Sequence, residues 1–403
     1  METPAPTNLE CFNCGNQHPF SLTIYVCSIC RGKLFVNYDY KNARAALEST
    51  LASDVALKSL WRYVALLPVN GEQAVLQRVG GTPLYEVKTS SPVALLFKDD
   101  TVNPSGSIKD RANAVAISCA LAAARNGIAV ASTGNAAVSL ACLGAATPLS
   151  VRVYVPQDLP AENLIRMRMY GADVRVVEGN YDEAYRECMV ACEEDLSIQN
   201  RNTAHNPFTR EGKKTCAFEI WEEMNRRVPE WVIVPVGDGN VLSGIWKGFH
   251  ELQRMGLAAR VPRLVAAQHV QSNVISRCFL SGEDPRRWRP ASRMAGGIAS
   301  SLRVQEPADL TGAVFALKKS AGLAVTVDDV AILHAMSMLA DAYGLFVEPA
   351  AAASYASFLQ LAARGVFAHG ERVVCLLTGS GLNSPQAART AFEHANGTGG
   401  RRS

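Results

Sequence analysis

This chain of 403 residues has few aromatic side chains and only a small excess of positive over negative charge, and it lacks long apolar runs. No apolar run reaches the roughly 18 residues of a membrane helix, and the first residues lack the basic and apolar regions of a signal peptide. The formal net charge of +3 is too small to indicate a nucleic-acid or membrane-surface partner. The 48% hydrophobic and 19% charged residues are typical of a globular protein with a large core. We therefore expect a cytoplasmic protein.

A disulfide framework is also not expected, because eleven cysteines are an odd number spread over a long chain. Four of them form two CxxC pairs that are separated by twelve residues. Such pairs can fold as tight knuckles whose thiolates converge on a tetrahedral zinc site, and Gly15 and Gly32 suit the positive-φ turns of such knuckles. The predicted structural Zn²⁺ ligands are Cys11, Cys14, Cys27 and Cys30. Four reduced thiols in a small subdomain are the alternative.

The N-terminal segment 1–40 does not have the charge of a nucleic-acid-binding ribbon. Its basic residues, Arg31 and Lys33, are outnumbered by Glu2, Glu10 and Asp39. No surface there could neutralise phosphates, so we interpret the segment as a structural zinc ribbon.

Strand-like and helix-like segments alternate through the rest of the chain. The predicted strands are 85–87, 93–98, 128–132, 150–155, 173–177, 231–236, 264–268 and 372–377. The predicted helices are 43–60, 112–125, 136–146, 160–170, 181–194, 243–254, 328–343 and 350–363. Strands this apolar, each followed by a helix, predict an α/β fold with parallel sheets covered by helices on both faces.

One lysine lies where a helix start disfavours a cation. The segment 103–111 (NPSGSIKDR) follows a predicted strand and leads into a helix that we expect to end at the C-cap pair Asn126-Gly127. Lys109 falls on the first helical turn, where the dipole disfavours positive charge by roughly a few tenths of a kcal/mol. An amine so placed can act as a nucleophile toward an aldehyde, although an ordinary exposed lysine is the alternative.

Two further turns lead from a strand into a helix. Ser132, Thr133, Gly134, Asn135 and Ala136 combine helix N-terminal amides with two hydroxyls, which makes either a carboxylate site or a simple N-cap.

The second of these turns, 235–244, is rich in glycine, and its amides converge on one spot that favours a dianion. The residues expected at a bound phosphate are Gly237, Asp238, Gly239, Asn240 and Val241. The side chain of Asp238 would have to point away from a phosphate.

Together these segments resemble the fold-type II pyridoxal phosphate (PLP) enzymes, which include threonine synthases, serine and threonine dehydratases and cysteine synthases. The resemblance starts near Gly80 and implies that Lys109 binds PLP and later transfers protons. It also implies that the 132–136 loop grips the substrate α-carboxylate, while Asn135 bonds the phenolic oxygen of PLP. Thr378 aligns with the hydroxyl residue that faces the pyridine nitrogen in threonine synthases. The ribbon is also similar to one found in several threonine synthases.

The resemblance implies a domain arrangement as well. The ribbon would occupy 1–40, and a large PLP-binding α/β domain would be formed by 41–114 and 211–395. A small α/β substrate domain would span 115–210, and 396–403 would be a disordered tail. A homodimer is expected from the resemblance alone.

The expected reaction is that of a threonine synthase, which eliminates phosphate from O-phosphohomoserine and adds water to give threonine. The sequence departs from the family pattern at two places. Thr209 stands at the position of the family's phosphate-gripping arginine, with Arg210 one residue late, and Asn383-Ser384 replaces a Lys-Asp pair. The alternatives are β-replacement or β-elimination on an activated serine such as O-phosphoserine, as in cysteate synthase-like or cysteine synthase-like enzymes, and an inactive binding module.

Overall fold

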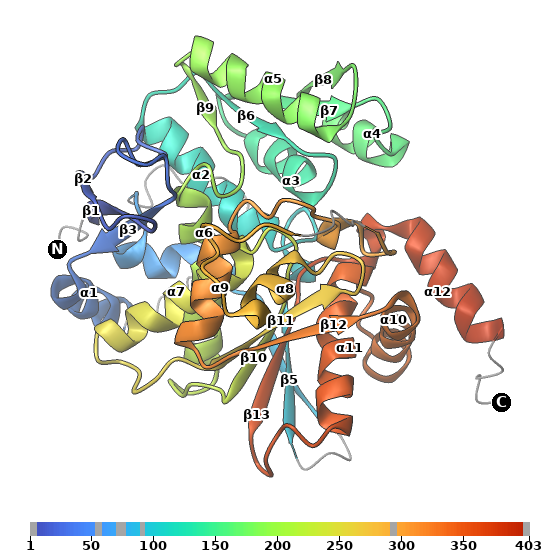
Figure 1. Cartoon of the computed structure of the whole chain (residues 1–403). Helices are drawn as coiled ribbons and strands as arrows, with labels where there is room; N and C mark the ends of the chain where they lie inside the picture. The colour runs from blue at the N-terminus through green and yellow to red at the C-terminus, as the bar shows by residue number, and fades with distance from the viewer. Residues whose placement is uncertain (1–5, 53–58, 70–77, 89–92, 291–295, 398–403) are drawn as a thin grey trace. The chain divides into compact units, whose positions relative to one another are not determined.

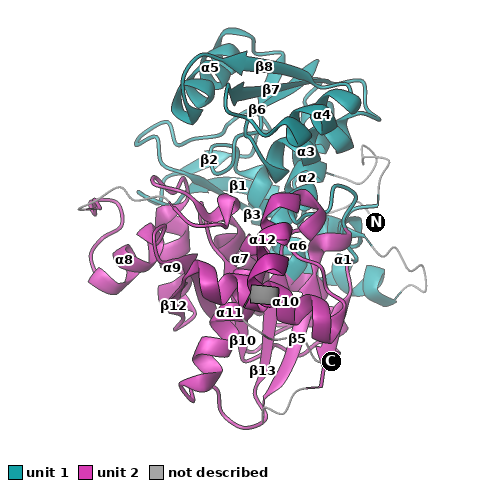
Figure 2. Cartoon of the chain, turned by 90° about the vertical axis from the view of Figure 1, so that its right-hand side faces the viewer, with its two compact units in different colours: residues 1–81, 103–216 teal, residues 82–102, 217–403 magenta. Residues whose placement is uncertain are grey.

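The computed structural model describes residues 6–52, 59–69, 78–88, 93–290 and 296–397. The chain forms two compact units, coloured separately in Figure 2. Unit 1 contains residues 1–81 and 103–216, and unit 2 contains residues 82–102 and 217–403. Each unit contains a mainly parallel sheet with helices, as Figure 1 shows, so the predicted α/β class is confirmed.

Unit 1 begins with a small antiparallel sheet in the order β2-β1-β3. Its strands are β1 (Pro6–Cys11), β2 (Gln17–Pro19) and β3 (Leu34–Tyr38). Helix α1 (Tyr40–Ala52) and the 3-10 segment η1 (Leu60–Leu66) follow. The helix predicted over 43–60 therefore ends at Ala52, and residues 53–58 lie outside the described part of the chain.

The second sheet of unit 1 is parallel, in the order β8-β7-β6-β9. Its strands are β6 (Gly127–Ala131), β7 (Ser150–Pro156), β8 (Asp173–Val177) and β9 (Ile198–Asn200). The helices of this unit are α2 (Lys109–Ala122), α3 (Asn135–Gly144), α4 (Ala161–Met169) and α5 (Tyr181–Glu194). Helix α6 (Phe208–Glu223) begins in unit 1 and ends in unit 2.

Unit 2 contains a six-stranded sheet in the order β12-β11-β10-β13-β5-β4, parallel except for the edge pair β4–β5. Its strands are β4 (Leu84–Val87), β5 (Ala94–Asp99), β10 (Trp231–Pro235), β11 (Arg263–His269), β12 (Leu323–Val327) and β13 (Arg372–Leu377). The helices are α7 (Asn240–Arg254), α8 (Val274–Ser281), α9 (Leu310–Lys319), α10 (Asp329–Tyr343), α11 (Pro349–Ala363) and α12 (Pro385–Gly397). Short 3-10 segments are η3 (Asp100–Val102), η4 (Ser300–Leu302) and η5 (Gly381–Asn383).

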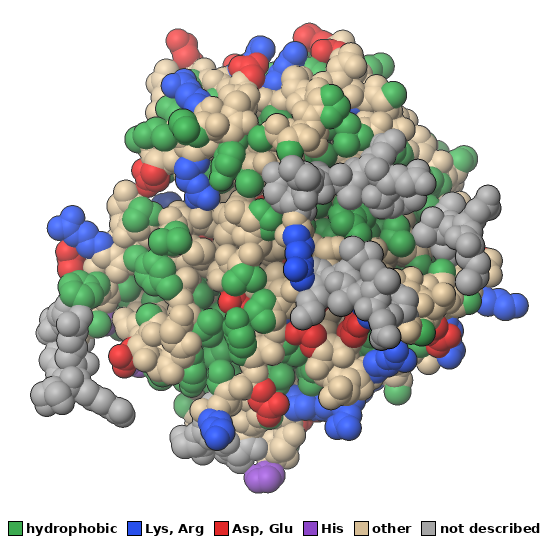
Figure 3. Space-filling model, turned by 180° about the vertical axis from the view of Figure 1, so that it is seen from behind, with side chains coloured by type: hydrophobic (Ala, Val, Ile, Leu, Met, Phe, Trp, Pro, Cys, Tyr) green, Lys and Arg blue, Asp and Glu red, His purple; other side chains and the backbone are tan. Residues whose placement is uncertain are grey.

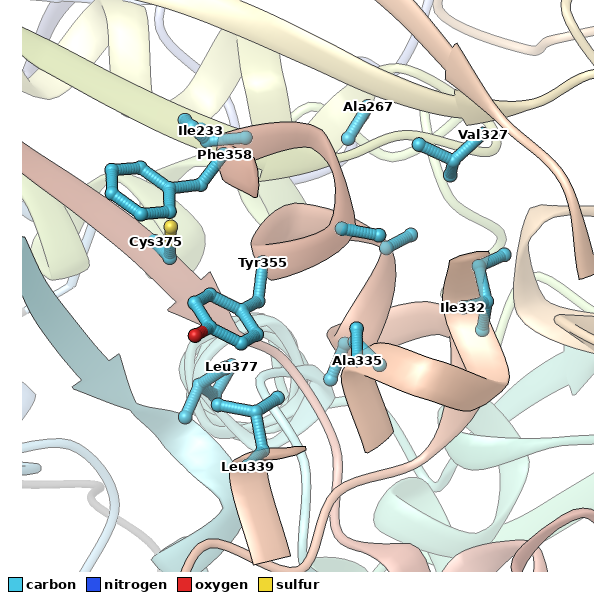
Figure 4. Close-up of a cluster of buried hydrophobic side chains, with 14 of the residues drawn as sticks. Ile233, Ala267, Val327, Ile332, Ala335, Leu339, Tyr355, Phe358, Cys375 and Leu377 are labelled. Carbon is cyan, nitrogen blue, oxygen red and sulfur yellow. The ribbon is translucent and has the colours of Figure 1, made fainter. Parts of the chain in front are cut away.

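The core of unit 2 lies where the small-residue face of α11 packs on the sheet. Four consecutive alanines, 350–353, are buried there, and their size lets the helix approach the strands closely. Figure 4 shows Tyr355 and Phe358 of α11 beside Cys375 and Leu377 of β13. Aliphatic strands and an alanine-rich helix thus remove a large apolar area from water, which is the main favourable term in folding.

The end of helix α2 differs from the prediction. The helix stops at Ala122, and Ala124 rather than a glycine adopts the left-handed conformation, with φ of 50°. Gly127 is the first residue of β6 instead. The Ala124 N–H donates to Leu121 O and the Arg125 N–H to Ala120 O, so the chain closes the helix through its backbone. The predicted C-cap at Asn126-Gly127 was wrong because these bonds form earlier.

Two predicted boundaries can be compared with the units. The structure places residues 41–81 and 103–114 in the same unit as the four-stranded sheet, whereas the sequence assigns 41–114 to the large domain. That division into domains stays a prediction. Helix α12 includes the first two residues of the predicted tail, and residues 398–403 lie outside the described part.

The described surface carries both signs of charge. On the face drawn in Figure 3, basic and acidic side chains are interspersed among the coloured residues. Within the described ranges, every helix is too short or too polar to cross a membrane.

Candidate active site and metal centre

The four N-terminal cysteines converge on one point in the ribbon. Their Sγ atoms all lie within 4.8 Å of one another. The Sγ–Sγ distances are 3.4 Å for Cys11–Cys30, 3.7 Å for Cys14–Cys27 and 3.5 Å for Cys14–Cys30. A tetrahedral zinc ion with Zn–S bonds of about 2.3 Å would hold sulfurs about 3.8 Å apart. The cluster therefore has the size of a four-sulfur zinc cage.

The two knuckles have the same hydrogen bonds. The N–H of Asn13 donates to Cys11 Sγ and the N–H of Ile29 donates to Cys27 Sγ, each at 3.4 Å. Burial acts against the Cys27 thiolate, but the backbone N–H of Cys30, the His18 ring and the backbone N–H of Ile29 outweigh it and lower the pKa of Cys27 to about 6. Burial raises the pKa of Cys11 to about 12. A bound cation would be needed to bring all four sulfurs to the thiolate form.

One of the two glycines of the knuckles has a role that differs from the prediction. Gly15 has a positive φ of 73°, as expected, but at the second knuckle Arg31 adopts the left-handed conformation with φ of 58°. A Cβ on Gly32 would lie 2.9 Å from Cys11 Sγ, so close approach to the sulfur requires glycine there. His18 Nε2 lies 3.4 Å from Cys27 Sγ and supports the cluster from outside the four-cysteine set.

The ribbon packs on the start of helix α6, and this contact fixes Arg210. The Arg210 guanidinium lies 4.2 Å from the Phe35 ring centroid, and its Nη1 donates to Leu34 O at 3.2 Å. Arg210 is 1% exposed. The neighbouring Thr209 is also buried, and its Oγ1 donates to Asn206 O at 2.9 Å. Both side chains at this sequence departure are therefore held by contacts within unit 1.

A buried charge network adds to the same contact. Tyr38 Oη donates to Glu211 Oε2 at 2.8 Å, and Lys214 Nζ lies 2.6 Å from the same oxygen. The Lys214 ammonium also lies over the Tyr38 ring at 4.2 Å. This network could not be predicted, because nothing in a linear sequence connects residue 38 with residue 211.

Lys109 lies in the first turn of helix α2, as predicted, and the helix begins at this residue rather than at the predicted residue 112. It is only partly buried, whereas its neighbours Ile108 and Asp110 are fully buried. Its backbone N–H donates to Ser107 Oγ at 3.4 Å. Lys109 is thus a partly exposed residue at the positive end of a helix whose neighbouring residues are buried.

The predicted carboxylate loop follows β6 and ends at the start of α3. Gly134 is the N-cap residue and Asn135 the first residue of the helix. Residues 132–136 are all partly exposed, between a buried strand and a buried helix. Gly134 N–H donates to Ser132 Oγ at 3.3 Å, so one hydroxyl shapes the loop itself. The arrangement leaves helix N-terminal amides accessible to an anion.

The predicted phosphate turn follows β10 and leads into α7. Gly239 is the N-cap, with φ of 91°, and the helix's own hydrogen bonds begin with Ser243 N–H donating to Gly239 O at 3.0 Å. A Cβ on Gly239 would lie 2.9 Å from Asp309 O, so packing as well as φ requires glycine. Helix geometry leaves the first amides of α7 as donors for an anion.

Two carboxylates lie next to this turn. The side chain of Asp238 is directed to the segment before α9, where Oδ1 lies 3.5 Å from Ala308 N. Asp309 is buried and its Oδ2 accepts hydrogen bonds from Asn240 Nδ2 at 3.0 Å and from Ser243 Oγ at 2.5 Å. Asp309 therefore orients side chains of the first α7 turn. Sequence reasoning missed this residue, because Asp309 lies about 70 positions from the turn.

Thr378 follows β13 directly and is 7% exposed. The next residue, Gly379, accepts a hydrogen bond through its carbonyl from Glu348 N–H at 2.9 Å. Glu348 is buried, and its carboxyl group lies so close to Gly379 that a Cβ there would be 2.4 Å away. The segment before α11 thus seats the turn that carries Thr378.

Sheet register brings the two motifs of unit 2 to one edge. Strands β10 and β13 are parallel neighbours, with Ile233 opposite Cys375. Both strands end two residues later, so the phosphate turn and Thr378 leave the sheet at the same level. In α/β folds ligands bind at the carboxyl ends of parallel strands. Unit 1 independently brings the first turns of α2, which begins at Lys109, next to the 132–136 loop, since Asn113 Nδ2 donates to Ala136 O at 3.0 Å.

The sequence also matches a known protein family. Residues 75–379 match the family described as pyridoxal-phosphate dependent enzyme. The match covers most of the chain, so the chain belongs to this family, as its resemblance to the fold-type II enzymes implied.

Among curated relatives, the chain is 34% identical over 392 residues to the threonine synthase of Methanosarcina acetivorans, covering 94% of this chain and 93% of the relative. It is 35% identical over 391 residues to the threonine synthase of Methanocaldococcus jannaschii, covering 95% of each chain.

Solved structures agree on the fold. Maize serine racemase has a TM-score of 0.66 at 17% identity, covering 89% of this chain and 98% of that one. The processed form of threonine deaminase isoform 2 from Solanum lycopersicum has a TM-score of 0.66 at 17% identity, covering 87% and 94%. At such identities the similarity concerns the fold alone.

Proposed function

We propose that this chain is a PLP-dependent synthase that releases phosphate from O-phosphohomoserine and adds water to give threonine. The observation that supports this most is the similarity to two threonine synthases at 34% and 35% identity, which extends over nearly the whole of each chain.

Each group of predicted site residues has features that suit PLP. Lys109 would hold the cofactor, the amides of residues 237–241 would hold its phosphate, and the Thr378 hydroxyl would face its pyridine nitrogen. Asn135 would bond the phenolic oxygen. The glycine-capped start of α7 supports an anion there, and Asp238 does not oppose one, because its side chain is directed to Ala308. When bound, the cofactor supplies an electron sink for carbanions.

The chain's own residues would then move protons and orient the substrate. The 132–136 loop would hold the α-carboxylate on helix N-terminal amides, which fixes the substrate Cα. The Lys109 amine would take the proton from Cα and transfer protons at Cβ as phosphate leaves from Cγ. Because the α2 dipole disfavours the ammonium form, the amine returns its proton readily. Water would add at Cβ in the final step.

We also propose that Cys11, Cys14, Cys27 and Cys30 hold a structural Zn²⁺. Four protein sulfurs leave no open coordination position, which is typical of structural rather than catalytic zinc. Packing of the ribbon on α6 supports a role in stability. A homodimer in the cytoplasm completes the proposal, and it rests on the family resemblance.

A second candidate function is β-replacement or β-elimination on O-phosphoserine. The contacts of Arg210 favour it, because its guanidinium is engaged by Phe35 and Leu34 of the ribbon. Recognition of a phosphate by arginine depends on a directed, bidentate geometry. Arg210 is held by the ribbon instead, and Thr209 has no guanidinium.

Product identification separates the two candidates. The purified, cofactor-loaded protein is incubated with O-phospho-L-homoserine and, separately, O-phospho-L-serine, and phosphate and amino-acid products are measured. We expect phosphate and threonine from the first substrate. Release from O-phospho-L-serine alone would exclude threonine synthesis, and a colourless protein inactive on both would favour the binding module. Light scattering after size-exclusion chromatography tests the dimer.

A further inference from the structure

The residue after Lys109 is a fully buried carboxylate. Asp110 Oδ2 accepts a hydrogen bond from Ser105 N–H at 2.7 Å, and Oδ1 accepts one from Ser105 Oγ at 2.5 Å. These bonds close the loop that precedes the lysine. Asp110 also lies in the first turn of α2, where a negative charge is favoured by the dipole.

The same carboxylate reaches the helix that begins at the predicted carboxylate loop. Ser139 Oγ of α3 donates to Asp110 Oδ1. Ser139 Oγ in turn accepts a hydrogen bond from Asn113 Nδ2 at 2.7 Å, and Asn113 Nδ2 also contacts Ala136 O at 3.0 Å. Buried hydrogen bonds therefore run from the lysine loop to the 132–136 loop through side chains on α2 and α3.

Helix α4 joins the same two loops a second time. Asn163 Nδ2 donates to Thr133 O at 2.9 Å, and Arg166 Nη2 donates to Ser105 O at 3.2 Å. Asn163 and Arg166 are three residues apart on one helix, so they lie on the same side of it. Ser105 is thus held from two directions, by Asp110 and by Arg166.

Packing alone does not explain why a charged carboxylate, that of Asp110, is buried between α2 and α3. Removing a carboxylate from water costs several kcal/mol, and buried charged groups can often be replaced by well-packed apolar residues without loss of stability. Asp110 and Ser139 are both 0% exposed, in helices otherwise rich in alanine. Directed hydrogen bonds give a fixed geometry, which apolar contacts specify less closely.

We infer that Asp110 and Ser139 are positioning residues that hold the Lys109 loop and the 132–136 loop at a fixed separation. The inference rests on the proposed roles of Lys109 and of the loop. The amine must reach the proton on the substrate Cα, and the α-carboxylate bonded to that Cα is held by the 132–136 loop. A shift of this loop relative to the loop that precedes Lys109 would therefore misplace the reacting atoms. A misplacement of about 1 Å can cost roughly 100-fold in rate.

The test uses the cofactor-loaded variants Asp110→Asn, Ser139→Ala and the double variant. Ser320→Ala is the matched control, because Ser320 is a buried helix-end serine of unit 2 whose Oγ donates to Ala316 O at 2.7 Å. Three properties are measured: the pH midpoint of the cofactor's visible absorbance without substrate, kcat and KM for O-phospho-L-homoserine, and Tm.

We expect Ser139→Ala to raise KM about 10-fold with a small change in kcat, and Asp110→Asn to lower kcat/KM about 100-fold. Both should shift the absorbance midpoint, and the double variant should be no worse than Asp110→Asn, because the two residues share one network. Ser320→Ala should change Tm alone.

Changes confined to Tm, or effects that add in the double variant, would overturn the inference. If Asp110→Asn does not fold, Ser139→Ala decides alone. A wild-type protein that binds cofactor but does not turn over O-phospho-L-homoserine overturns the proposed reaction, and the absorbance midpoints then test the positioning role. A wild type that binds no cofactor overturns both.

Discussion

At the scale of single residues, Lys109 is a partly exposed lysine at the helix end where the dipole disfavours positive charge. It begins α2, it is partly exposed, and the residues on either side are buried.

Lys109→Ala should abolish the bound chromophore and lower activity by at least about 1,000-fold, because in the proposed mechanism the amine both binds cofactor and moves protons. Visible absorbance and peptide mapping after borohydride reduction measure this. Lys41→Ala, at an exposed position on α1, is the control and should leave both unchanged. Trapped cofactor on any peptide without Lys109 would contradict the assignment.

His205 lies where the ribbon meets the loop before α6. Its ring centroid is 5.7 Å from that of Tyr25. Burial, with smaller contributions from Lys33 and Arg31, lowers the pKa of His205 to about 4. The unfolded chain, with an ordinary pKa of about 6.5, therefore binds more protons between pH 6.5 and 4. Stability from this group is present above pH 6.5 and is lost as the pH falls.

The free energy of unfolding should fall by about 2 kcal/mol more in wild type than in His205→Gln between pH 7 and pH 5. Urea unfolding at a series of pH values measures this difference. His369→Gln, at an exposed position, should keep the wild-type slope. Parallel curves for wild type and His205→Gln would show that His205 does not titrate in this way.

At the scale of elements, the ribbon and the start of α6 stabilise each other. The ribbon contributes Phe35 and Tyr38, and α6 contributes Arg210, Glu211 and Lys214. A small three-stranded sheet has little core of its own, so we expect its order to depend on this contact and on the proposed metal.

Cys14→Ser should remove the bound zinc and lower Tm by roughly 5 °C or more, since metal binding contributes directly to folding. Elemental analysis and thermal unfolding measure zinc content and Tm. Cys278→Ala is the control, because Cys278 is a buried cysteine of α8 outside the cluster and should leave one zinc per chain. If a chelator removes zinc from the wild-type protein and Tm does not change, the structural role is contradicted.

At the scale of the whole molecule, α6 is shared by the two units, and its second half is fixed by a buried lysine. Lys98 of β5 is 0% exposed, and its Nζ lies 2.9 Å from Glu219 Oε2 and 2.7 Å from Glu223 Oε1. Thr82 O accepts a further hydrogen bond from the same ammonium. Without Lys98 the buried carboxylate of Glu219 would lose its cation, whereas Glu223 lies at an exposed position.

Lys98→Met should lower the free energy of unfolding by about 3–5 kcal/mol, because it leaves buried negative charge uncompensated. Denaturant unfolding measures the loss. Arg389→Ala breaks the exposed Arg389–Glu393 pair and should change stability by less than about 1 kcal/mol. Adding Glu219→Gln to Lys98→Met should recover part of the loss, and the absence of any recovery would contradict this explanation.

The sequence by itself determined the fold class and much of the secondary structure. Strands β8 and β13 and helix α5 have the predicted bounds, because apolar strands and helix periodicity are local signals. The two CxxC pairs were likewise enough to predict a cluster of thiols. Whether Lys109, the phosphate turn and Thr378 act on one cofactor stays a prediction.

Only the tertiary structure revealed what holds those motifs. Strand β9 and helix α6 have weak local patterns and form through their partners, since β9 is three residues long and α6 carries buried charges. The contacts of Asp110 with Ser139 and of Arg210 with Phe35 join positions 29 and 175 residues apart. Composition and spacing do not encode such pairings, because they depend on which surfaces meet when the chain packs.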